Sequence, residues 1–238
     1  MIPIRGEPPK QCRPWVTLGL IAVNVAIFLY QWHLGTEGAA DLLRQKGAVA
    51  ARLSQPNLLT SYQALKLLPT MFSSLFLHAG WVHLVGNMWV LWLFGEGLED
   101  DLGHCRFLVF YLFCGFFSGI FHVLAAWRLT APLVGASGAI AGVLGGYLVR
   151  RTKAPIQTVV FWRLRPQIRQ VPAFVYLLIW LGLQFYGLRQ GGPVGWAAHL
   201  GGFAIGMLTV NYFLPVDPEA KPQKPKARKR RGGKGKKR

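Results

Sequence analysis

Acidic residues and cysteines are scarce in this chain. The first shortage makes the chain strongly basic, and the second argues against a disulfide-stabilised protein. Its 238 residues include only 9 Asp and Glu against 27 Lys and Arg, so the formal net charge is +18. The three cysteines, Cys12, Cys105 and Cys114, are odd in number and lack paired spacing, so they imply neither a disulfide framework nor a zinc site. Charged residues amount to 15% of the chain, whereas 52% is hydrophobic. This balance is typical of a membrane protein rather than a soluble domain.

Long apolar runs take the place of the missing charge. The mean hydropathy is +0.31, and several runs approach the roughly 20 residues that a helix needs to cross a bilayer. No small-residue cleavage site follows the first run, so we expect it to stay as a span rather than to be removed as a signal peptide. The hydropathy pattern predicts an all-α, polytopic protein with six transmembrane helices, at about 15–33, 81–98, 105–127, 137–150, 172–190 and 197–214.

Basic residues set the expected orientation. Most of the 27 Lys and Arg lie before the first span, between the fourth and fifth spans, and after the last span. Because positive charge stays on the cytoplasmic side, we expect both chain ends to be cytoplasmic and the protein to be a multi-pass component of a cell membrane. The chain then divides into a cytoplasmic segment 1–14, a membrane domain 15–214 and a basic tail 215–238.

The basic tail carries eleven Lys and Arg in its last 18 residues and no acidic residue. It has no apolar surface to bury, so we expect it to be disordered. The simplest partner is the anionic lipid headgroups of the bilayer, which attract each nearby basic residue by about 1 kcal/mol; nucleic acid is not expected. Two other segments, "GAADLLRQKGAVAARL" outside and "IQTVVFWRLRPQIRQ" inside, are expected to lie on the membrane surface.

Four polar residues stand inside the predicted spans at one depth. His83 and Asn87 fall in the first turns of the second span. Ser137 opens the fourth span, and His199 lies in the first turn of the sixth. These three spans run from outside to inside, so all four side chains are expected near the outer membrane surface. Polar groups at membrane depth are costly to bury and usually functional, so the shared depth indicates a site.

Each of these residues also has a structural or metal-binding interpretation. Small residues such as Gly138 let helices approach closely, and Ser137 could belong to the same packing surface. His83 and His199 could bind zinc together with His122, since three histidines form a known zinc site. No His-Glu-x-x-His motif supports the metal, and the spacing by itself leaves both interpretations open.

Taken together, the four residues supply the parts of acyl transfer without a metal or another cofactor. His199 can accept the proton whose loss makes Ser137 nucleophilic. The Ser137 backbone N–H at a helix N-terminus, the Asn87 amide and the His83 imidazole can donate hydrogen bonds to an oxyanion. No carboxylate lies in the outer half of a predicted span, so a Ser–His dyad is favoured over a triad.

Four short motifs follow one another along the membrane region. They are "FLHAGWVHLVGNM" (76–88), "GLEDDLG" (97–103), "GASG" (135–138) and "AHLGGFAIG" (198–206). In these motifs the chain resembles the rhomboid family of intramembrane serine proteases, in its bacterial six-helix form. The resemblance implies a six-helix bundle with a site below the outer membrane surface, in a bacterial inner membrane. It also implies transmembrane protein substrates, cut in or near their membrane segments.

The resemblance also implies a role for each matching polar residue. Ser137 corresponds to the nucleophile and His199 to the general base. His83, Asn87 and the Ser137 backbone N–H correspond to the oxyanion stabilisers. These are the roles that acyl transfer requires of a serine, a base and a set of donors.

Further matching positions carry structural roles in the family. His78 corresponds to a histidine near the water-filled cavity, and Glu99 to a structural carboxylate at the end of the second span. Gly138 and Gly202 belong to packing surfaces, and Gly202 would let the sixth span pack tightly on the fourth. Ala141 departs from members that place an aromatic there to stack on the histidine, so Trp196 or packing alone would have to orient it.

Two other classes of function compete with a protease. An inactive relative that binds and escorts membrane proteins has no need to keep both Ser137 and His199, which argues against it. A transporter would suit polar, discontinuous helices, but the chain shows no internal repeat. The external connection also lacks the Trp-Arg pair of some rhomboid proteins, which leaves loop geometry and substrate choice open.

Overall fold

The computed structural model describes residues 2–54, 67–162, 165–190 and 195–215, and these residues are mostly helical. Six of the helices correspond to the predicted spans within a few residues at each end. They are α1 (Trp15–His33), α6 (Trp81–Leu102), α7 (His104–Ala125), α8 (Ser137–Arg150), α9 (Ala173–Gln190) and α10 (Trp196–Thr209). The short helix η2 (Val210–Phe213) follows α10. Apart from Pro215, the predicted tail lies outside the described residues.

These six helices differ in length and composition. Within the described residues, α1 and α7 are long and apolar enough to cross a membrane. α8 and α10 have 14 residues each, or about 21 Å at 1.5 Å per residue, which is short of a hydrocarbon core of about 30 Å. The last turns of α6 are acidic, so its apolar part is shorter than the helix. Six membrane spans therefore remain a prediction.

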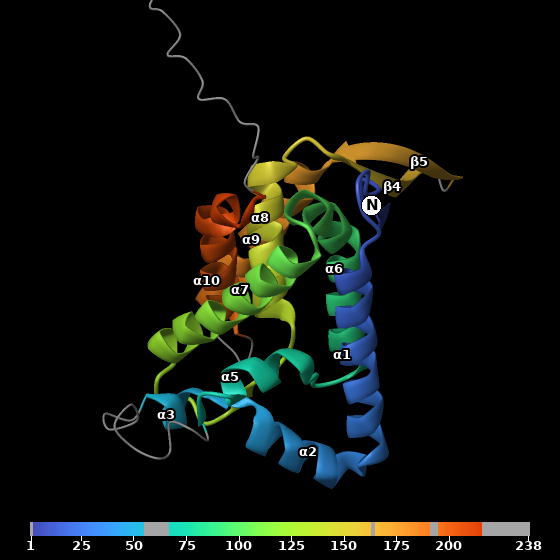
Figure 1. Cartoon of the computed structure of the whole chain (residues 1–238). Helices are drawn as coiled ribbons and strands as arrows, with labels where there is room; N and C mark the ends of the chain where they lie inside the picture. Colours follow the sequence, from blue (N-terminus) through green and yellow to red (C-terminus); the bar gives the residue numbers. More distant parts are fainter. Residues whose placement is uncertain (1, 55–66, 163–164, 191–194, 216–238) are drawn as a thin grey trace, which may run out of the picture.

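The two ends of the bundle differ in what covers them. Figure 1 shows the N-terminus and the hairpin of β4 (Pro155–Trp162) and β5 (Arg165–Pro172) at one end. The opposite end carries α2 (Gly35–Lys46), α3 (Ala50–Leu53) and α5 (Thr70–Ser73), which leads through η1 (Ser74–Phe76) toward α6. α6, α8 and α10 all begin toward this second end (Figure 1). Their first turns, which hold the candidate site, therefore lie together.

Two small sheets correct the expectation of an all-α protein. β1 (Ile2–Arg5) joins the hairpin in an antiparallel sheet of order β1-β4-β5. β2 (Ala48–Val49) pairs with β3 (Pro132–Leu133). The β-branched residues of β4 favour a strand, and its Thr158 is buried, with its hydroxyl 2.6 Å from that of Tyr176 on α9. The segment "IQTVVFWRLRPQIRQ" thus forms a hairpin, and its strand pairing depends on partners that hydropathy does not reveal.

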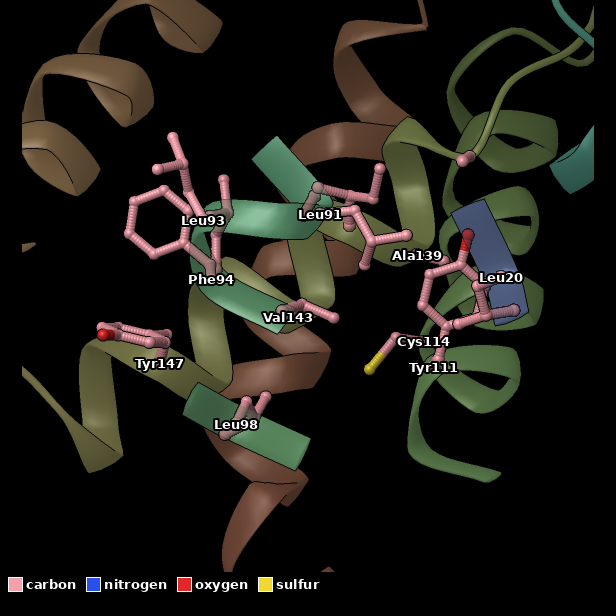
Figure 2. Packing of buried hydrophobic residues seen from close by; sticks show 14 of the residues in the cluster. Leu20, Leu91, Leu93, Phe94, Leu98, Tyr111, Cys114, Ala139, Val143 and Tyr147 are labelled. Carbon is pink, nitrogen blue, oxygen red and sulfur yellow. The ribbon is translucent and has the colours of Figure 1, made fainter. Parts of the chain in front are cut away.

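The hydrophobic core lies where α6, α7 and α8 meet. Figure 2 shows Leu91 and Leu98 of α6, Tyr111 of α7, and Val143 and Tyr147 of α8 within one cluster. All five side chains are fully buried. Most residues of α8 are buried as well, so α8 is a central helix that holds its first residue in one place.

α8 and α10 pack backbone against backbone through glycines. A Cβ atom at Gly202 would overlap the carbonyl oxygen of Gly138, and one at Gly206 would overlap that of Gly142. Because glycine has no side chain, no other residue allows so close an approach without a shift of the helices. The crossing brings the first turn of α10 beside the first turn of α8.

Asp100 ties the N-terminal segment to the end of the bundle farthest from the candidate site. Its carboxylate accepts hydrogen bonds from the backbone N–H groups of Lys10, Gln11 and Cys12 at 2.7–3.0 Å. The Arg151 guanidinium donates a further bond at 3.1 Å. Burial acts to raise the pKa of Asp100, but these hydrogen bonds outweigh it and hold the pKa below its ordinary value.

This lowered pKa predicts a loss of stability in acid. The contribution of Asp100 is fully present above its unfolded pKa of about 3.9 and is lost as the pH falls through the lower folded value. Asp100→Asn should cost about 2 kcal/mol near neutral pH and should flatten the acid side of the stability profile. Thermal unfolding of the purified protein across acid and neutral pH measures both effects.

Asp41→Asn is the matched control for this prediction. The ion pair of Asp41 with Arg44 is exposed on both sides, so its removal should change little. Identical acid profiles for wild type and Asp100→Asn would contradict the assigned role of Asp100.

Candidate functional site

Ser137 and His199 meet at the point where α8 and α10 begin. Ser137 is the first residue of α8, and His199 lies in the first turn of α10. The Ser137 Oγ and the His199 Nε2 are 2.8 Å apart, a hydrogen-bond distance. The residues are 62 positions apart in the chain, and the glycine crossing of the two helices brings them together.

His83 and Asn87 lie against the backbone that leads into Ser137. Gly135 has φ +117°, a conformation that side chains disfavour. A Cβ at Gly135 would lie 2.6 Å from the His83 Cε1 and 3.5 Å from the Asn87 Nδ2. The Asn87 side chain is buried, and among the described residues its Nδ2 has no hydrogen-bond acceptor. Two side-chain nitrogens of α6 thus adjoin the start of α8.

A cavity of about 680 Å³ joins these groups. α6, α8, α9 and α10 all contribute to its wall, as does the loop that contains β3. Its polar lining residues are His83, Asn87, Ser137, Gln184 and His199. The four polar residues expected at one depth therefore open into one cavity.

Gln184 is a cavity residue that the sequence interpretation did not include. It lies on α9 and is 5% exposed. Its Oε1 is 2.8 Å from the His199 Nδ1, the ring nitrogen that faces away from Ser137. The sequence did contain a signal, because Gln184 is a polar residue in the outer half of a predicted span, as His83 and Asn87 are.

Aromatic rings from α9 and α10 flank His199. The Trp196 ring meets the imidazole edge-on with 6.0 Å between centroids, and the Trp180 ring lies at 6.2 Å. Because Ala141 stands where some rhomboid proteins have an aromatic residue, Trp196 or packing alone is expected to orient the His199 ring. The Gln184 Oε1, which accepts a hydrogen bond from the His199 Nδ1 at 2.8 Å, adds a polar partner to these two.

His78 and Glu99 are not among the residues that line this cavity. The His78 ring packs edge-on against His83 with 5.1 Å between centroids, on the side of a separate cavity of about 380 Å³ next to α1 and α2. Glu99 is fully buried at the far end of α6, where its carboxylate accepts the backbone N–H groups of Val16 and Thr17 at 2.9 and 2.8 Å. Among the described residues, neither of them is a hydrogen-bond partner of the Ser137 or His199 side chain.

His122 is buried on α7 and is not part of the cavity wall. Within the described residues, no three His, Cys, Asp or Glu side chains are grouped closely enough to hold a metal ion. The three-histidine arrangement of His83, His122 and His199 considered from the sequence is therefore not assembled here.

The site combines a serine, an imidazole and free hydrogen-bond donors inside a helical bundle. The first N–H groups of α8 have no acceptor within the helix, and the helix dipole favours negative charge at this end. A hydroxyl paired with an imidazole beside such donors has the components of acyl transfer. The fold and the site together place this protein in the class of helical proteins that have a Ser–His pair at a helix N-terminus.

Residues 67–216 match the Rhomboid domain family. The match covers more than half of the chain, and the chain belongs to the rhomboid family of membrane proteins. The matched range 67–216 includes all four motifs that resemble the rhomboid family. It also contains the helices that carry Ser137, His199, His83 and Asn87.

Similar proteins are found in organisms that include a plant, a yeast and a protozoan. The chain is 29% identical to RHOMBOID-like protein 4 of Arabidopsis thaliana over 240 residues, covering 90% of this chain and 57% of that protein. It is 30% identical to Rhomboid protein 1, mitochondrial, of Saccharomyces cerevisiae over 201 residues, covering 79% and 50%. Rhomboid-like protease 3 of Toxoplasma gondii is 31% identical over 140 residues, covering 58% and 49%. The chain thus spans about half the length of these relatives.

Proposed function

We propose that this protein is an intramembrane serine endopeptidase that cuts peptide bonds in or near the transmembrane segments of other membrane proteins. The observation that carries the proposal is the 2.8 Å contact between the Ser137 Oγ and the His199 Nε2 in a cavity at the start of α8. Membership of a family whose relatives include a named protease supports it.

The proposed reaction uses this contact twice. The Ser137 Oγ attacks the carbonyl carbon of the substrate while its proton passes to the His199 Nε2. The C–N bond then breaks, and the leaving amine takes the proton from His199, which leaves an acyl-enzyme on Ser137. Water attacks this ester and gives a proton to His199, which returns it to Ser137 as the carboxylic acid product leaves. No metal or cofactor takes part in the proposed steps.

Three donors adjoin the place where negative charge develops on the substrate oxygen. The backbone N–H of Ser137 lies at a helix N-terminus, and the Asn87 Nδ2 is buried without an acceptor among the described residues. The His83 ring lies beside the same backbone. Donors of this kind act in the transition state, where the oxygen carries more charge than in the substrate.

The proposed setting is a multi-pass arrangement in a cell membrane, with six spans and both ends cytoplasmic. The first turns of α6, α8 and α10 then lie toward the outer surface, and the basic segment 215–238 faces anionic headgroups of the inner leaflet. Single-span membrane proteins are the proposed substrates.

A serine-reactive fluorophosphonate probe tests the proposed nucleophile. We expect the wild-type protein to be labelled, since the probe phosphonylates a serine whose proton a neighbouring base accepts, and fluoride leaves. Ser137→Ala should remove the label, and mass spectrometry should place it on the peptide that contains Ser137. Labelling that persists in Ser137→Ala, or is absent from folded wild type, would overturn the assignment.

A further inference from the structure

Gln184 makes two hydrogen bonds that fix the direction of its side-chain amide. Its Nε2 donates to the backbone carbonyl of Trp180, one helical turn earlier on α9, at 3.1 Å. Its Oε1 is 2.8 Å from the His199 Nδ1. Rotating the amide by 180° would place the Oε1 against the Trp180 carbonyl oxygen, two acceptors facing each other. The amide therefore presents an acceptor to His199.

The direction of this amide determines which nitrogen of His199 carries the proton. A neutral imidazole has one N–H and one acceptor nitrogen. Because the Gln184 Oε1 can only accept, the proton must be on the Nδ1, which leaves a lone pair on the Nε2. The Nε2 is the atom that lies 2.8 Å from the Ser137 Oγ, so this tautomer is the one that can accept the serine proton.

The position of α9 against α10 maintains the contact. The Trp180 ring stacks on Phe203 of α10, one turn after His199, with 5.6 Å between centroids. Gln184 is 5% exposed, so water has little access to compete for the Nδ1–H. Burial makes the loss of such a hydrogen bond more costly than at a surface.

We propose that Gln184 is the positioning residue that holds His199 in the tautomer and ring orientation needed to activate Ser137. The inference rests on the proposed protease function and extends it from a Ser–His pair to a hydrogen-bonded Ser–His–Gln triad on α8, α10 and α9. Gln184 acts through His199: the neutral amide takes no proton and only orients the ring and stabilises its protonated form.

Substitutions at Gln184 separate this role from a structural one. Gln184→Met keeps the length of the side chain but removes the acceptor, and kcat for a single-span substrate should fall on the order of 10–100-fold, a part of what a positioned base contributes. Gln184→Glu restores an acceptor and should recover most of kcat. The same substitution at an exposed position of α9, Gln190→Met, should leave kcat unchanged.

A pH profile adds a readout that packing does not produce. A carboxylate at position 184 stabilises the imidazolium more than an amide does, so the acid limb of kcat in Gln184→Glu should move to higher pH than in wild type. Nitrogen NMR of histidine-labelled protein should show the proton on the Nδ1 in wild type and a mixture of tautomers in Gln184→Met.

The outcomes distinguish this inference from the function on which it rests. If wild type cleaves, Ser137→Ala does not, and Gln184→Met cleaves like wild type, the positioning role is wrong and the protease function stands. Equal loss in Gln184→Met and Gln184→Glu, with an unmoved acid limb, would also overturn the positioning role. If folded wild type neither cleaves nor reacts with the fluorophosphonate, the proposed function itself fails.

Discussion

Ser137→Ala is expected to abolish cleavage of a single-span substrate reconstituted with the protein in lipid vesicles. Without the Oγ there is no atom to form the acyl-enzyme, and no second hydroxyl is found among the polar residues of the cavity wall in the described chain. The substitution removes one oxygen from a half-buried side chain, so the protein should stay folded. Cleavage is measured by the appearance of the two substrate fragments on a gel.

His199→Ala should reduce cleavage as severely as Ser137→Ala does, because the two residues act as one unit. Removing both should cost little more than removing either, since residues that serve the same step are not additive. Asn87→Ala provides a graded comparison and should lose activity by about 10–10³-fold, as for a single oxyanion donor.

His33→Ala is the matched control for the histidine substitution. His33 is the last residue of α1 and is exposed, outside the cavity wall, so cleavage should be unchanged. Normal turnover by purified Ser137→Ala would end the assignment of Ser137 as the nucleophile. Full activity of His199→Ala would require a different base.

Gly202→Val is also expected to have a large effect, although Gly202 makes no contact with substrate in the proposed reaction. Its missing side chain is what allows α10 to approach the carbonyl of Gly138 on α8. A valine would push the helices apart, and a displacement of about 1 Å at a reacting pair can cost about 100-fold in rate. Both cleavage and fluorophosphonate labelling should fall by at least this order.

The proposed cause can be separated from general unfolding. Gly202→Ala adds a single methyl group and should show a smaller loss in the same direction, while circular dichroism should report an unchanged helix content. Gly182→Val is the matched control on α9, because a Cβ there meets nothing within 4 Å, and its activity should be retained. A Gly202→Val protein that cleaves at the wild-type rate would show that the crossing does not set the Ser137–His199 distance.

Several features could be predicted from the sequence because their causes are local. α1 and α8 begin and end where the apolar runs predicted, since hydropathy and helix length act within one segment. The polar residues His83, Asn87, Ser137 and His199 stood out because each interrupts an apolar run. Their expected common depth in the membrane follows from the alternating direction of successive spans alone.

Other features depend on contacts between distant segments. The β1-β4-β5 sheet pairs residues 2–5 with residues near 158, and neither segment signals its partner. His78 lies five residues before His83, and only the folded chain shows that its ring packs against His83 and also lines a second cavity next to α1 and α2. α8 and α10 have only 14 residues each, so their hydropathy alone does not establish that they cross a membrane.

The sequence by itself determined the family, the residues of the Ser–His pair and the glycines that let two helices meet. Only the tertiary structure decided that Gln184 is the third member of the hydrogen-bonded triad. In the sequence Gln184 is one polar residue in an apolar helix, and nothing local relates it to His199, 15 positions further along the chain. Burial of its amide between Trp180 and His199 leaves each polar atom one partner, and that pairing exists only once α9 packs against α10.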